Sequence, residues 1–312
     1  MRREGSALRG LGVVTLKELS DHMTSARMRV LEWLVVLVAL AAVYAAITQV
    51  RDSTAEDPFL FLRLFTTARD PLPSFTAFLG FLVPLMAIGL GFDAVNGEHS
   101  RRTLSRILSQ PIYRDALLFG KFLAGLATLS VSLVVLWLIT IGLGLIMLGV
   151  PPGAEEMARA FIFLLVTIAY AGVWLALAML SSVLFRSAAT AALVTLGFWL
   201  FITLIWPALS PAIVTAFVPS NDEATLVIAA QSLARLSPSV LYAEAVTAIL
   251  HPATRTLGPV YISQLQGAVM GSPLSLWSSV MVAWPQIVGL IAASILLFVG
   301  GYVAFQRQEV RA

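Results

Sequence analysis

Residues 122–150 read FLAGLATLSVSLVVLWLITIGLGLIMLGV, a run of 29 residues without a charged side chain. A helix needs about 20 predominantly apolar residues to cross the roughly 30 Å hydrocarbon core of a bilayer, so this run is long enough to span a membrane. The whole chain has the same character, because 59% of its 312 residues are hydrophobic and 12% are charged. A soluble domain of this composition would expose large apolar patches. We therefore predict an all-α polytopic membrane protein.

Five further apolar runs reach or approach the length of a span. They cover residues 30–50, 72–92, 160–185, about 188–218 and 279–305. Pro207 and Pro211 are expected to kink the fifth of the six spans in chain order, because proline interrupts helical hydrogen bonds. Glu32 and Asp93 lie at span ends, where we expect them in the headgroup layer.

Basic residues in the connections predict the orientation. If the N-terminus is inside, the inner segments carry 14 Lys and Arg residues and the outer segments carry 6. This excess predicts cytoplasmic N- and C-termini in the plasma (inner) membrane. The predicted organisation is a cytoplasmic N-terminus, spans one to five with an inner loop at 93–121, an outer segment, and the last span with the C-terminus. These four parts cover residues 1–29, 30–218, 219–278 and 279–312.

Before the first span, Leu16, Leu19 and Met23 recur at helical spacing, while Lys17 and Glu18 fall on the other side. This pattern predicts an amphipathic helix that lies in the plane of the membrane. The alternative is a basic tail that only satisfies the orientation rule.

The inner loop contains a short amphipathic stretch at residues 98–109. Arg102 and Arg106 are one i,i+4 step apart, where like charges repel. The opposite, apolar face consists of Leu104, Ile107 and Leu108. One interpretation is a helix that docks into an acidic cleft of a cytosolic partner. The other is a solvated loop whose arginines serve topology and anionic lipid headgroups.

The outer segment at 219–278 is predicted to be partly helical. Ser237 and Pro238 suit an N-cap and the first helical position. Its apolar content suggests a segment that lies on the outer leaflet or forms a small cap.

The chain lacks the sequence patterns of most enzymes. It has no cysteine, which excludes disulfides and thiolate sites, and its three histidines are far apart. Glu98-His99 lacks the second histidine of HExxH, and Gly120-Lys121 lacks the rest of a Walker A loop. The net charge of +3 comes without a basic stripe, so no nucleic-acid partner is expected. We predict a non-catalytic chain without a cofactor of its own.

The inner loop resembles that of the permease subunits of ABC type-2 transporters. The shared motifs, in the family's order and at similar spacing, are Gly97-Glu98, Thr103-Leu104, Leu108-Ser109, Pro111, Arg114 and Gly120-Lys121. Lys17-Glu18-Leu19 is similar to the family's interfacial helix. Ser100 and Arg102 depart from the family pattern, so the pairing with an ATPase is expected to differ in detail. Within the family, residues 85–93 and 237–242 look closest to permeases that help to mature nitrous-oxide reductase.

The resemblance implies a permease subunit of an exporter, driven by two copies of a separate cytosolic ATPase that hold ATP and Mg. A second permease copy, in a homodimer, and membrane lipids are the other implied partners. Residues 98–109 would be the coupling helix. The implied ATPase-coupling residues are Glu98, Arg101, Arg102, Thr103, Leu104, Arg106, Ile107, Leu108, Pro111 and Arg114. Two alternatives are an ATP-independent secondary transporter or channel and a non-transporting membrane scaffold.

Overall fold

The computed structural model describes residues 10–52, 59–100, 114–219, 222–257 and 273–307. All of its named elements are helices, which confirms the predicted all-α fold. The elements are α1 Leu11–Thr24, α2 Ala26–Asp52, η1 Leu60–Leu62, α3 Arg63–Thr66, α4 Phe75–Gly91, α5 Asn96–Ser100, α7 Arg114–Leu148, α8 Ala154–Leu184, α9 Ala188–Leu200, η2 Phe201–Ile205, α10 Trp206–Phe217, α11 Glu223–Ala234, α12 Pro238–Leu250 and α14 Leu276–Arg307.

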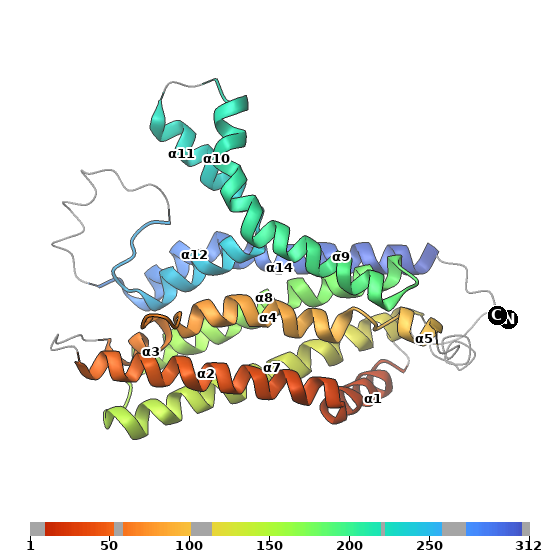
Figure 1. Ribbon diagram of the computed structural model, residues 1–312, viewed down its shortest axis with the longest axis horizontal. Coiled ribbons are helices and arrows are strands. Elements are labelled where there is room, and N and C mark those ends of the chain that lie inside the picture. The colour runs from red at the N-terminus through yellow and green to blue at the C-terminus, as the bar shows by residue number, and fades with distance from the viewer. Residues whose placement is uncertain (1–9, 53–58, 101–113, 220–221, 258–272, 308–312) are drawn as a thin grey trace.

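Within the described residues, six helical stretches are long and apolar enough to cross a membrane, as the sequence predicted. They are α2, α4 with α5, α7, α8, α9 to α10, and α14. These helices form an elongated bundle (Figure 1) in which α8 packs against α4, α7, α12 and α14. Helix α8 is central because it buries side chains along its whole length, including Tyr170 and Trp174.

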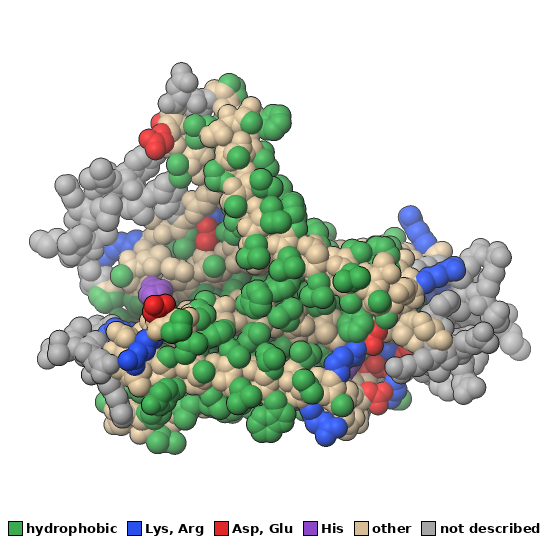
Figure 2. Space-filling model, viewed as in Figure 1, with side chains coloured by type: hydrophobic (Ala, Val, Ile, Leu, Met, Phe, Trp, Pro, Cys, Tyr) green, Lys and Arg blue, Asp and Glu red, His purple; other side chains and the backbone are tan. Residues whose placement is uncertain are grey.

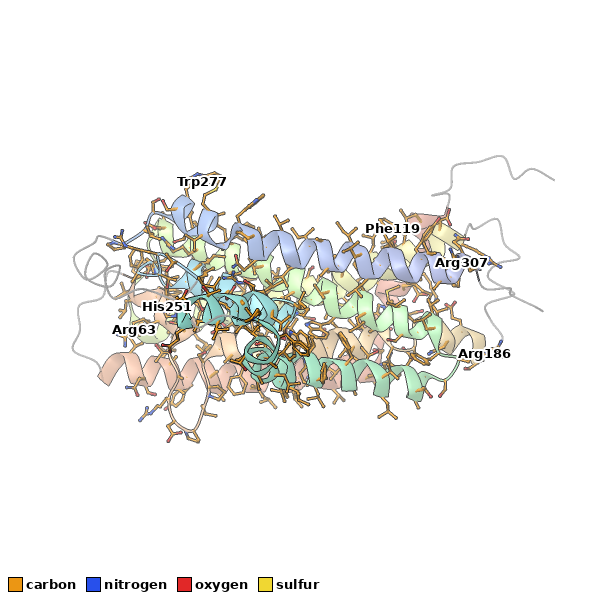
Figure 3. The ribbon with its side chains drawn as sticks, turned by 90° about the horizontal axis from the view of Figure 1, so that it is seen from above. Arg63, Phe119, Arg186, His251, Trp277 and Arg307 are labelled. Carbon is orange, nitrogen blue, oxygen red and sulfur yellow. The ribbon has the colours of Figure 1, made fainter. Side chains whose placement is uncertain are left out.

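The two ends of the bundle can be told apart by the residues that lie there. Figure 3 places Phe119, Arg186 and Arg307 at one end, and Trp277 and His251 at the other. We call the first the proximal end and the second the distal end. Helices α1 and α5 lie at the proximal end (Figure 1). On the face drawn in Figure 2, hydrophobic side chains cover the middle of the bundle and charged side chains gather towards its two ends, as a membrane-spanning bundle requires.

The fifth span is kinked where its prolines begin. A π-helical turn, η2, separates α9 from α10, and Pro207 follows in the first turn of α10. Proline supplies no amide hydrogen, so the preceding turn widens and the axis bends. In Figure 1 the chain changes direction at this point, and α10 and α11 extend away from the bundle.

Helices α11 and α12 are joined by a bend of 108°. Helix α12 packs against α8 and α14, and it buries Tyr242 and Ile249 among them. Its Glu244 accepts hydrogen bonds from Arg235 Nε at 2.8 Å and from Gln286 Nε2 at 2.9 Å. The outer segment of the sequence therefore contributes a helix to the core of the bundle.

Arg159 holds the distal end together. Its side chain is fully buried and donates five hydrogen bonds. Two reach Glu155 Oε1, one reaches Ser279 Oγ at 3.0 Å, and two reach the backbone carbonyls of Ile249 (2.8 Å) and Leu274 (2.6 Å). One guanidinium thus joins α8, α12, α14 and the segment before α14.

Candidate functional site

Three segments that carry family-like motifs meet at the proximal end. They are Lys17-Glu18-Leu19 on α1, Gly97-Glu98 on α5 and Gly120-Lys121 on α7. Lys121 Nζ lies 3.0 Å from Glu18 Oε2 and 2.7 Å from Glu98 Oε1. The Lys121 side chain is only 5% exposed. We call Glu18, Glu98 and Lys121 the proximal ion cluster.

The electrostatics of the cluster favour the charged form of Glu18. A buried ammonium is costly unless it is paired, and Lys121 has two carboxylates within ion-pair distance. Burial raises the pKa of Glu18, but the ammonium of Lys121 and hydrogen bonds from Lys17 and Lys121 outweigh it and hold that pKa below its usual value. Lys17 Nζ lies 2.8 Å from Glu18 and 2.8 Å from Asp21. The cluster therefore extends along α1.

Gly120 allows α1 to approach α7 closely. A Cβ atom at this position would lie 2.8 Å from Val14 Cγ1 and 3.0 Å from Val14 Cβ. Val14 and Glu18 are one helical turn apart, and they are the buried residues of α1. The face of α1 that contacts α7 is therefore the face that carries Glu18, while Leu16 and Met23 are exposed. The position of α1 in the membrane plane stays a prediction.

A second ion pair fixes the start of α2. Arg27 donates from Nη1 to Asp93 Oδ2 at 2.9 Å and from Nη2 to Asp93 Oδ1 at 3.2 Å. The Arg27 guanidinium also lies 5.0 Å from the centroid of the Phe92 ring. Two parallel bonds and a ring contact define the geometry of this pair more tightly than a single contact would. It ties α2 to the end of α4.

The chain shortly before residues 101–113 is anchored on α8. Ser182 Oγ accepts hydrogen bonds from the backbone amides of Val95 at 2.9 Å and Asn96 at 3.2 Å. The Asn96 side chain donates to the carbonyl of Phe185 at 3.1 Å and is 2% exposed. A Cβ at Gly91 would lie 2.7 Å from Ala178 Cβ, so α4 and α8 are in close contact here.

A polar hollow of about 240 Å³ lies beside the cluster. Its lining includes Glu18, His22, Asp93 and Glu98. Burial lowers the pKa of His22. Among the described residues, no group of three or more Asp, Glu or His side chains is placed to hold a metal ion. The proximal ion cluster can hold α1, α5 and α7 in position, and its charged side chains can change partners.

The structure covers two of the predicted ATPase-coupling residues. Glu98 lies in α5 and pairs with Lys121, and Arg114 begins α7. The others lie outside the described residues: Arg101, Arg102, Thr103, Leu104, Arg106, Ile107, Leu108 and Pro111. The predicted coupling helix therefore stays a prediction. What the structure adds is that the chain is held on both sides of this segment.

Sequence reasoning missed the roles of Lys121, Glu18 and Asn96. The sequence motif Gly120-Lys121 includes Lys121 without indicating a partner for it, and helical spacing places Glu18 on the polar face of α1. One signal was available, because Lys121 directly precedes the uncharged run at 122–150. A lysine at that place needs either water or a carboxylate. The sequence does not say which of the chain's carboxylates it meets.

A family model described as ABC-2 family transporter protein matches residues 13–310. Among curated relatives, a protein of Pseudomonas aeruginosa named probable ABC transporter permease protein NosY is 30% identical over 183 residues, which are 57% of this chain and 59% of that protein. A protein of the same name from Stutzerimonas stutzeri is 28% identical over 194 residues, which are 62% of this chain and 66% of that protein. In both cases the chain covers less than two thirds of the relative's length.

Proposed function

Because the chain belongs to the ABC-2 transporter family, we propose that it is the membrane-spanning subunit of an exporter that a separate cytosolic ATPase drives. ATP and Mg then bind to the partner chain. The likeness to two proteins named as ABC transporter permeases supports the membrane-spanning role. The segments predicted to be inside carry 14 basic residues and those predicted to be outside carry 6, which supports a cytoplasmic proximal end.

The observation that carries the proposal is the proximal ion cluster. Glu98 stands at the start of the proposed coupling helix, residues 98–109, and pairs with Lys121 on α7. Lys121 in turn pairs with Glu18 on α1. A force on residues 98–109 would therefore reach a spanning helix and the N-terminal helix together. The anchors of Val95 and Asn96 on Ser182 would carry the same force to α8.

The proposed contacts with the ATPase follow the amphipathic pattern of residues 98–109. Leu104, Ile107 and Leu108 insert into an apolar groove of the ATPase. The bases that contact its acidic rim are Arg101, Arg102 and Arg106. Two ATPase copies and two copies of this chain form the assembly, and nucleotide-driven closure of the ATPases moves the two coupling helices.

The test is to replace Leu104 and Leu108 with Asp and to measure ATP hydrolysis by the co-purified ATPase in vesicles. We expect permease-stimulated hydrolysis to be abolished, because the apolar face is lost, while membrane insertion is unchanged. Ser105→Asp with Ser109→Asp is the matched control, since it adds the same charge to neighbouring positions and leaves the apolar face intact. Unchanged stimulation in the leucine variant would refute the proposal.

A further inference from the structure

A groove separate from the proximal ion cluster lies between α2 and α7. Its volume is about 480 Å³, within the range of pockets that bind small organic molecules. Apolar side chains of both spans line it, with Met23 of α1 and Met86 of α4. Trp33, Val131 and Val135 line it and are also exposed, so the groove is open on the outer surface of the bundle. A molecule dissolved in the bilayer can enter from the side.

The groove contains one acidic side chain, Glu32. Ser132 Oγ donates a hydrogen bond to Glu32 Oε1 at 2.9 Å. Within the described part of the chain, no Lys, Arg or His side chain forms an ion pair with Glu32, and Arg29, three residues earlier on α2, is not within ion-pair distance of it. The carboxylate is therefore available to a cation from outside the chain.

Glu32 lies in the second turn of α2. The expected span began at residue 30, but α2 begins at Ala26, because Ser25 Oγ accepts a hydrogen bond from the amide of Met28 at 3.1 Å and caps the helix. Glu32 is thus about 9 Å along α2. Its partner Ser132 lies eleven residues beyond Lys121 on α7, about 16 Å further along that helix. The acidic side chain of the groove is therefore separated along α7 from Lys121 and its two carboxylate partners.

The side chains around Glu32 define the chemistry of a ligand. A carboxylate surrounded by apolar side chains favours a positive charge beside it. The indole of Trp33 is the aromatic ring that binds organic cations best, and methionine side chains adapt to apolar groups of irregular shape. We propose that this groove binds an amphipathic organic cation, with its charge at Glu32 and Trp33 and its apolar body along Met86, Val131 and Val135.

Other occupants match the groove less well. A lipid acyl chain would leave the carboxylate of Glu32 facing hydrocarbon. A second copy of the chain would have to bring a basic residue to a position in the middle part of α7. The proposal does not depend on the ATPase, and its test uses no ATP, so its outcome is separate from that of the proposed function.

The probe is radiolabelled tetraphenylphosphonium, a cation with an apolar body, and the protein is the full chain in dodecyl maltoside, a neutral detergent. We expect saturable binding to the wild type and at least tenfold weaker binding to Glu32→Gln, which keeps the shape of the side chain and removes its charge. Glu223→Gln is the matched control, because it removes an exposed carboxylate far along the chain, on α11. This variant should bind like the wild type.

Two further arms separate charge from shape. Tetraphenylborate has nearly the same shape and the opposite charge, so it should not compete. Val135→Trp keeps Glu32 and fills the groove, and it should also lose binding while eluting as a folded protein in size-exclusion chromatography. Equal binding by the wild type and Glu32→Gln, equal competition by the anion, or no saturable binding at all would overturn the proposal. If dimeric fractions of the protein do not bind tetraphenylphosphonium, the groove is covered by a second copy of the chain. This result would also overturn the proposal.

Discussion

The two ends of the bundle both bury charged side chains, but they pair them in different ways. At the distal end, Arg159 donates to one carboxylate, one hydroxyl and two backbone carbonyls. At the proximal end, Lys121 is shared by two carboxylates on separate short elements, Glu18 on α1 and Glu98 on α5. Backbone carbonyls cannot move without the chain segments that carry them, whereas side-chain carboxylates can exchange partners. We therefore expect the distal end to act as a fixed anchor and the proximal end to act as a joint.

The largest effect should come from breaking the distal anchor. Arg159→Met removes all five hydrogen bonds and leaves the carbonyls of Ile249 and Leu274 without this donor. We expect a loss of about 3 kcal/mol in stability, in the range for removing one partner from a buried polar network. Thermal unfolding in detergent measures it.

The control for this variant is Arg186→Met, because Arg186 is an exposed arginine at the proximal end. This change should alter the stability by less than about 0.5 kcal/mol. If both variants unfold at the same temperature, Arg159 is not the anchor of the distal end.

A smaller loss of stability should come from an alanine at Gly120, where α7 contacts α1, and not from an alanine at Gly142 elsewhere on α7. Gly120→Ala places a methyl group 2.8 Å from Val14 Cγ1 and should cost about 1–2 kcal/mol by displacing α1 from α7. Gly142→Ala, also on α7, has no neighbour within 4 Å and should be neutral or slightly stabilising. Limited proteolysis of α1, with thermal unfolding, compares the two. Similar results for both variants would argue against tight docking of α1.

The smallest effect should be a pH dependence of the α1 contact. Burial lowers the pKa of His22, an effect that Glu18 and Asp21 oppose and that Lys121 and Arg27 reinforce. The unfolded chain therefore takes up a proton first as the pH falls below the ordinary value of 6.5, and the contact weakens. The lowered pKa of Glu18 adds a further loss below about its ordinary value of 4.5.

Proteolytic protection of α1 measured between pH 8 and pH 4 tests this dependence. His22→Gln should remove the loss between pH 7 and pH 5.5 and keep the loss at lower pH. A pH profile that is the same in the wild type and in His22→Gln would show that His22 does not contribute.

The spans could be predicted from sequence, because each needs only a long apolar run. The kink in the fifth span was also predictable, since Pro207 and Pro211 interrupt the backbone pattern. The burial of α12 was not. A helix of 13 residues is too short to be recognised as a span, and its apolar face fits the surface of a cap equally well as a place beside α8 and α14.

The candidate site was predictable only in part. Resemblance singled out Glu98 and the motifs around Glu18 and Lys121, but each was interpreted by itself. Periodicity placed Glu18 on a polar face, because the pattern within α1 contains no information about a lysine on α7. The start of α2 at Ala26, four residues before the predicted span, likewise depends on one hydroxyl, that of Ser25. Long-range pairs and single caps are the features that a sequence pattern does not determine.

The most direct test of the joint is a double-mutant cycle on Glu98 and Lys121, with stimulated ATP hydrolysis by the co-purified ATPase as the measurement. Glu98→Gln and Lys121→Met should each reduce the stimulation of ATP hydrolysis about tenfold. The double variant should retain as much stimulation as the less active of the two single variants, because the two residues act as one unit. Full stimulation in either single variant, or losses that multiply in the double variant, would contradict the account.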